Sequence, residues 1–116
     1  MNTLFILNDA PYGSERTYNG LRLAGALARQ EGDNVRVFLI GDGASAAHCN
    51  QKVPQGFYNI ADMLGNVIRH RGEVGICGSC MEARGIGESD IAAGTRRSSL
   101  AELAEWTAWA DKVLVF

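Results

Sequence analysis

Short, continuous apolar segments constrain the fold of this chain more than any other feature of its sequence. Four such segments occur, at residues 3–7, 35–40, 74–77 and 113–116. A short apolar segment without regular alternation is typical of a strand that is buried on both faces, as the strands of parallel sheets are. We therefore expect four buried strands, and a weaker pattern at residues 95–97 indicates a short fifth one.

Helical patterns separate these segments. Helices are expected at residues 14–32, 59–72 and 99–110, and a shorter one at residues 78–84. Each of the three longer ranges begins with a serine or an asparagine, such as Ser14, and these residue types are preferred as helix N-caps. Because parallel neighbours need crossover connections, this alternation predicts an α/β fold in which helices pack on a mostly parallel sheet.

The composition excludes several classes of protein. The 116 residues are 47% apolar and 21% charged, as in an ordinary globular protein, and they predict a single domain over residues 1–116. A net charge of −2 without a basic stripe argues against direct binding of nucleic acid. No apolar segment approaches the roughly 20 residues of a membrane-spanning helix. The N-terminus lacks a secretory signal, and three cysteines fit a reducing compartment better than a disulfide framework. We therefore expect a cytoplasmic protein.

The expected carboxyl edge of the sheet collects the candidate functional residues. In parallel α/β sheets, ligands bind beyond the carboxyl ends of the strands. Three loops are expected to meet there: residues 8–13, residues 41–56 and the turn at Cys77 and Gly78. Cys77 would also stand at the start of a short helix, where free N–H groups favour a thiolate, and Arg84 would lie on the same helical face. Cys77 is therefore the candidate nucleophile, and the alternative is a cysteine buried at a strand end.

Cys80 forms a Cys-x-x-Cys pair with Cys77, and three interpretations of this residue remain open. The pair could be a redox dithiol, although thioredoxin-like proteins carry such a pair early in the chain, after an aromatic residue. It could be half of a zinc site with His48 and Cys49, although these two are adjacent and a second pair is absent. Cys80 could also be a packed residue of the short helix. We expect no bound metal and no other cofactor.

Two further features lie in the last quarter of the chain. Arg96 and Arg97 are either a solvated pair or, at the same edge of the sheet, a means of holding an anion. Trp106, Trp109 and residues 113–116 carry more apolar surface than one small monomer readily covers. This surface indicates a homo-oligomer.

The motifs together resemble those of the DsrE/DsrF-like sulfur-relay family, most closely its YchN-like branch. The resemblance covers nearly the whole chain. Its most specific parts are the loop that contains Tyr12 and Gly13 and the segment from Cys77 to an Arg-Gly pair. The matching segments read "NDAPYGSE", "VRVFLIGDG", "ICGSCMEARGI" and "LAELAEWTAWADKVLVF".

The resemblance implies a three-layer α/β/α sandwich with a five-stranded, mostly parallel sheet, assembled as a trimer or as a hexamer of two trimers. It also implies that Cys77, eight residues before Gly85, accepts sulfur as a persulfide. Sulfur-donor and sulfur-acceptor proteins, and in some members sister subunits, are the implied partners. Cys80 has no counterpart in single-cysteine relay members but has one in YchN-like members.

We therefore expect a sulfur-transfer protein in which Cys77 is the sulfur acceptor and Cys80 resolves the persulfide or protects the site as a disulfide. Gly78 would leave room for a partner's sulfur, and Arg84 would stabilise the thiolate. The expected binding residues are Tyr12, Gly13, Gly78 and Arg84. A non-catalytic homo-oligomeric binding module and a Cys-x-x-Cys redox protein remain as alternatives. The sequence leaves open whether the protein is a sulfurtransferase enzyme or only a sulfur carrier.

Overall fold

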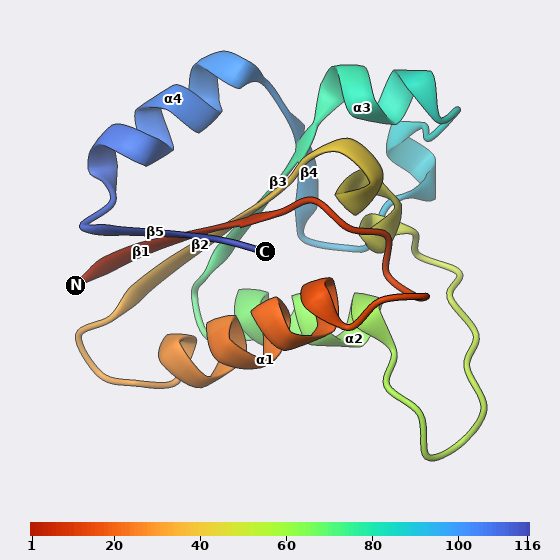
Figure 1. The fold of residues 1–116 in the computed structure, drawn as a ribbon, viewed down its shortest axis with the longest axis horizontal. Coiled ribbons are helices and arrows are strands. Elements are labelled where there is room, and N and C mark those ends of the chain that lie inside the picture. Colours follow the sequence, from red (N-terminus) through yellow and green to blue (C-terminus); the bar gives the residue numbers. More distant parts are fainter.

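A five-stranded sheet forms the centre of the structure, a computed structural model that describes residues 1–116 (Figure 1). The strands lie in the order β4-β3-β2-β1-β5, and every neighbouring pair is parallel. Their bounds are β1 Asn2–Leu7, β2 Asn34–Leu39, β3 Glu73–Cys77, β4 Thr95–Ser98 and β5 Lys112–Val115. The predicted parallel sheet is confirmed, and β4 is the strand that the weak pattern at residues 95–97 indicated.

Helices cover both faces of the sheet, as expected of an α/β/α sandwich (Figure 1). Helices α1 (Arg16–Ala28) and α2 (Ile60–Arg69) pack side by side on one face, and α4 (Leu100–Trp109) lies on the other. Helix α3 (Gly78–Ala83) follows β3 directly at the carboxyl edge. Two short 3-10 segments complete the structure, η1 (Gly41–Ala47) and η2 (Glu88–Asp90). None of the helices is long and apolar enough to cross a membrane.

The central strand β1 shows why the strand segments are continuously apolar. Successive side chains of a strand point to opposite faces. Phe5 and Leu7 belong to the larger core under α1 and α2, whereas Leu4 packs with Phe38 and Trp106 under α4. Because both faces are covered by helices, the consecutive positions from Leu4 to Leu7 are all apolar.

Two of the three expected helix caps are confirmed. The side chains of Asn59 and Ser99 accept hydrogen bonds from backbone N–H groups in the first turns of α2 and α4. The prediction for Ser14 is wrong. Its hydroxyl donates to the carboxylate of Asp9 at 2.7 Å, and Glu15 occupies the N-cap of α1 without a side-chain cap bond. The oxygen of Ser14 accepts from the backbone N–H of Arg16 at 3.4 Å, so this serine contacts the first residue of α1 without occupying its N-cap.

Segment η1 replaces the long polar loop expected after β2. It packs against the end of β1, where the N–H of Gly43 donates to the carbonyl of Asn8 at 3.0 Å. A Cβ atom at position 43 would lie 2.1 Å from the carbonyl oxygen of Leu7, so only glycine fits there. This close packing fixes Gly41 at the carboxyl edge, next to α3.

Candidate functional site

Cys77 lies at the junction of three elements. It is the last residue of β3 and the N-cap of α3, and in the sheet it pairs with Ser98 of β4. Its side chain is half-buried and packs against the smaller core, which includes Phe38 of β2. The structure therefore places Cys77 at the carboxyl edge of the sheet, where sequence reasoning expected the site.

The two thiols of the Cys-x-x-Cys pair are in direct contact. Neither cysteine forms a disulfide in this structure, and their sulfurs lie 2.7 Å apart, with the thiol of Cys80 as the donor to the sulfur of Cys77. The backbone N–H of Cys80 also donates to the Cys77 sulfur at 3.4 Å, and the Ser79 hydroxyl lies 3.4 Å from it. One turn of α3 thus directs several hydrogen-bond donors at a single sulfur atom.

These contacts separate the acidities of the two thiols. Burial raises the pKa of Cys77, but the hydrogen bonds from Cys80 and Ser79 outweigh it and leave this pKa below its ordinary value. Burial, the hydrogen bond that it donates and the charge of Cys77 raise the pKa of Cys80 above its ordinary value. Cys77 is therefore the more acidic thiol of the pair, and Cys80 is the less acidic one.

The sulfur of Cys80 faces the other side of the pair, toward η1. It accepts a hydrogen bond from the backbone N–H of Gly41 at 3.2 Å. Arg84 fixes this arrangement, because it donates to the carbonyl of Cys80 at 3.1 Å and to the carboxylate of Asp42 at 2.8 Å. Arg84 therefore holds α3 against η1 and has no direct hydrogen bond to Cys77, contrary to its expected role as a partner of the thiolate.

A cavity of about 340 Å³ opens beside Cys77. It lies between the turn at Cys77 and the junction of β4 with α4, and it is lined by Phe38, Cys77, Gly78, Ser79, Arg97, Ser98, Ser99 and Leu100. A Cβ at position 78 would lie 2.8 Å from Nε of Arg97, so the room that Gly78 leaves is taken up by this guanidinium. The sequence indicates Arg97 only as a possible anion ligand and does not indicate Ser98 or Ser99 at the site, because the pairing of β4 with β3 is what brings these residues to Cys77.

Tyr12 and Gly13, the other expected binding residues, do not line this cavity. The hydroxyl of Tyr12 donates to the side chain of Gln51 at 2.6 Å and accepts from the backbone N–H of Ile60 at 3.3 Å. Its ring stacks on Tyr58, with a centroid distance of 6.0 Å. Tyr12 thus holds the loop before α2 in place, while Gly13 supplies a turn with a φ of 104°.

No three histidine, cysteine, aspartate or glutamate side chains of the chain lie close enough together to hold a metal ion. His48 forms an isolated bridge with Ile91, and the backbone N–H of Cys49 donates to Asp90. The zinc alternative therefore has no ligand set in this structure.

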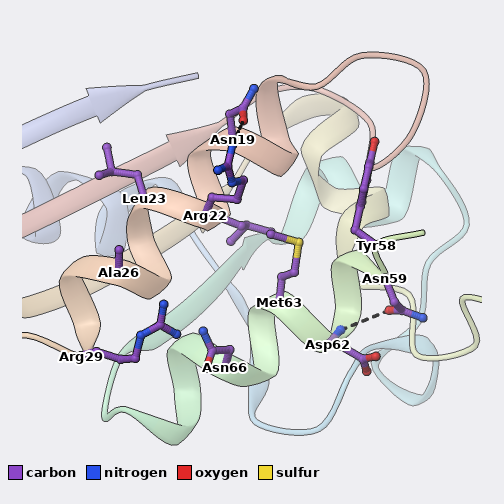
Figure 2. Close-up of a pocket in the computed structure, with 11 residues that line it drawn as sticks. Asn19, Arg22, Leu23, Ala26, Arg29, Tyr58, Asn59, Asp62, Met63 and Asn66 are labelled. Atoms are coloured by element: carbon purple, nitrogen blue, oxygen red, sulfur yellow. Dashed lines mark hydrogen bonds between the residues drawn. The ribbon is translucent and has the colours of Figure 1, made fainter. Parts of the chain in front are cut away.

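A larger cavity lies on the face of the sheet that α1 and α2 cover, whereas the Cys77 cavity opens beside α4. It is a groove of about 850 Å³ between α1 and α2 (Figure 2). Polar and charged side chains, among them Arg22, Arg29 and Asp62, line it together with Leu23 and Met63. No cysteine, serine or histidine lines this groove, so it lacks the groups that the thiol site provides.

The fold and the thiol site define a small α/β protein with a pair of free cysteines at the carboxyl edge of a parallel sheet. The sequence matches the profile of the DsrE/DsrF-like family over residues 1–116, and the chain belongs to this family. It is 42% identical over 114 residues to protein YchN of Escherichia coli, with 97% of both chains covered. It is also 36% identical over 111 residues to an uncharacterized protein of Methanopyrus kandleri, covering 96% of this chain and 90% of the relative.

Solved structures agree with this assignment. The crystal structure of ychN protein from E. coli superposes with a TM-score of 0.90 over 100% of both chains, at 42% identity. A protein of unknown function from Methanobacterium thermoautotrophicum shares the fold, with a TM-score of 0.76 over 99% of this chain and 98% of its own, at 11% identity. None of these relatives is named for an activity, so the function has to be argued from the site.

Proposed function

We propose that the protein is a sulfur-transfer protein of the sulfur-relay type, in which Cys77 accepts sulfur as a persulfide. The observation that carries this proposal is the contact between the two sulfurs, which lowers the pKa of Cys77 and raises that of Cys80. The thiolate is the reactive form of cysteine, and Cys77 presents it at the wall of an open cavity. Membership of the DsrE/DsrF-like family supports the same chemistry.

The proposed transfer needs no outside oxidant. The Cys77 thiolate attacks the outer sulfur of a donor persulfide, D–S–SH, and a bond forms between this sulfur and Sγ. The S–S bond of the donor breaks, and its electron pair leaves with the donor thiolate, D–S⁻. Cys77–S–SH then passes its outer sulfur to an acceptor thiolate by the same exchange. Donor and acceptor proteins are the proposed partners, in the cytoplasm, where thiols stay reduced.

Cys80 gives the persulfide a second outcome. If its thiolate attacks the inner sulfur of Cys77–S–SH, hydrosulfide leaves and a Cys77–Cys80 disulfide forms. A dithiol reductant is then needed to restore the two thiols. The contact at 2.7 Å makes this step geometrically available, and it also supports the alternative of a Cys-x-x-Cys redox protein.

Mass spectrometry after incubation with a persulfide donor tests the proposal. We expect the mass of one added sulfur atom on the peptide that contains Cys77, and none on this peptide in Cys77→Ser. Cys80→Ser should still gain the sulfur and should hold it longer. Loading that persists in Cys77→Ser but disappears in Cys80→Ser would reverse the roles of the two residues.

We also propose that the chain assembles as a homohexamer or a trimer. Two large apolar side chains are exposed on the single chain. Val115 of β5, which pairs with Ile6 in the sheet, is 64% exposed. Leu100, which lines the Cys77 cavity, is 75% exposed. Edge strand β5 is open to pairing, and closed symmetric assemblies are the usual way to cover such surfaces. Light scattering at micromolar concentration tests the assembly, and the mass of one chain would refute it. An intact oligomer whose Cys77 reacts no faster than an ordinary thiol would favour the non-catalytic binding module.

A further inference from the structure

The cavity beside Cys77 contains a cation that the transfer chemistry above does not use. Arg97 reaches it from β4, the strand that pairs with β3 so that Ser98 lies beside Cys77. Its guanidinium lies against Gly78, the residue after the nucleophile. A positive group and the sulfur of Cys77 thus share one cavity of about 340 Å³, which is within the size range of small-molecule sites.

Arg97 is only partly engaged by the protein. Its Nη2 donates to the carboxylate of Glu82 at 2.7 Å, and its other N–H groups have no protein partner. The side chains of Arg97 and Glu82 are 39% and 68% exposed, and ion pairs of such exposure contribute little to stability. The guanidinium can therefore bind a second anion, or exchange Glu82 for one, at small cost.

No other acidic side chain in the cavity competes for that place. Glu102, the nearest glutamate on α4, accepts hydrogen bonds from Ser98 and from Arg96. The hydroxyl of Ser99 accepts from the backbone N–H of Glu102, so its hydrogen remains available to a ligand. The cavity thus offers an anion a guanidinium edge and a hydroxyl.

We propose that Arg97 binds the anionic group of a small sulfur donor and orients the donor's outer sulfur toward Cys77. The expected donors are small persulfides that carry a carboxylate a few atoms from the sulfur. The inference rests on the proposed sulfur transfer and follows the same balanced step: the outer sulfur bonds to Sγ, and the donor leaves as a carboxylate-bearing thiolate. Arg97 takes no part in bond breaking and acts as a positioning residue.

Two alkylating reagents of nearly equal shape test the anion preference without any sulfur chemistry. Iodoacetate is an anion and iodoacetamide is neutral, and both alkylate a thiolate. The rate of each at Cys77 is followed by peptide mass spectrometry, which separates Cys77 from Cys80 and Cys49. The readout is the rate with iodoacetate divided by the rate with iodoacetamide. A change in the pKa of Cys77 alters both rates equally and therefore cancels in this ratio.

We expect this ratio to fall about tenfold in Arg97→Gln, the effect of losing one charge-assisted contact that is partly exposed. Arg97→Lys should keep part of the preference, and Glu82→Gln should increase it. Arg29→Gln is the matched control, since this arginine lies at the end of α1 on the opposite face of the sheet. An unchanged ratio in Arg97→Gln, or an equal fall in Arg29→Gln, would overturn the proposal.

Sulfur loading then separates this inference from the proposed function. The probes are the persulfides of mercaptopropionate and of its neutral amide. Faster loading of Cys77 from the carboxylate form, lost in Arg97→Gln, supports both proposals. Equal loading from both probes overturns the donor preference but keeps the sulfur-transfer function. Loading from neither probe, with an alkylation ratio that still depends on Arg97, overturns the small-donor proposal and keeps only the anion site. The sulfur-transfer function is refuted only if a protein persulfide also fails to load Cys77.

Discussion

Replacing Cys80 by alanine should slow the alkylation of Cys77 at neutral pH. The thiol of Cys80 donates directly to the Cys77 sulfur at 2.7 Å, and this contact is the largest of the hydrogen bonds that lower the pKa of Cys77. A hydrogen bond to a charged group contributes about 1.5–3 kcal/mol, and a thiol is a weak donor. Taking the lower limit, about 1.5 kcal/mol, the thiolate fraction of Cys77 at a pH below both pKa values falls by a factor of roughly ten.

The loss of Cys80 should slow the alkylation of Cys77 only at a pH below the pKa values of Cys77 in the two proteins. A hydrogen bond to the thiolate favours the charged form, so its loss raises the pKa of Cys77. Below both pKa values the variant therefore has less thiolate and reacts more slowly, whereas above both values the two proteins react at the same rate. Iodoacetamide rates at Cys77, measured from neutral to alkaline pH in a Cys49→Ser background, follow this difference directly.

Ser79→Ala is the matched control for the Cys80 variant. Its hydroxyl lies 3.4 Å from the Cys77 sulfur, which is a longer and weaker contact, so the rate at neutral pH should fall by less. Circular dichroism confirms that each variant keeps its fold. A Cys80→Ala protein that is folded and reacts as fast as the wild type at neutral pH would refute the assignment of Cys80 as the proton donor.

Two further predictions concern stability. Gly43→Ala should lower the free energy of unfolding by about 2–3 kcal/mol, because the added Cβ meets the carbonyl oxygen of Leu7. Gly65→Ala in α2 should raise the free energy of unfolding by about 0.5–1 kcal/mol, because alanine has the higher helix propensity. Urea unfolding measures both changes. The hydrogen bond from Ser98 lowers the pKa of Glu102 in the folded protein. The stabilisation by the Glu102 carboxylate is therefore complete above the ordinary glutamate pKa of about 4.3, and it is lost as the pH falls through the lower pKa of the folded state. Glu102→Gln should therefore cost about 1 kcal/mol at pH 7 and nothing in strong acid, and an equal loss at both pH values would contradict this.

The buried parts of the fold were predictable because burial on both faces leaves a pattern in the sequence. Strand β1 is apolar from Leu4 to Leu7, since helices cover both sides of it. Strand β4, by contrast, reads Thr-Arg-Arg-Ser and is exposed at an edge of the sheet. Pairing with β3, rather than its own side chains, makes it a strand. The register of β4 against β3 could therefore not be predicted from the sequence, and neither could the position of Arg97 at the site.

The expectation for Arg84 shows a second limit. Counting helical turns from Cys77 places Arg84 on the same face as the thiol, but α3 ends at Ala83. Arg84 therefore leaves the helical path and pairs with Asp42 of η1, a segment that the sequence indicated only as a polar loop. Local patterns located the two thiols, whereas contacts between distant segments decided which charged groups surround them.

The two thiols have separate surroundings, and this bears on whether a persulfide at the site survives. Cys77 lines the cavity, whereas the sulfur of Cys80 faces η1 and accepts the N–H of Gly41. Exchange at a persulfide requires the attacking thiolate, and the pKa of Cys80 is raised by burial and by a negative charge on Cys77. A persulfide anion keeps that negative charge in place, which lowers the thiolate fraction of Cys80 and slows its attack. Sulfur can then leave through the cavity to an acceptor before the disulfide forms, which makes a two-cysteine site compatible with sulfur transfer.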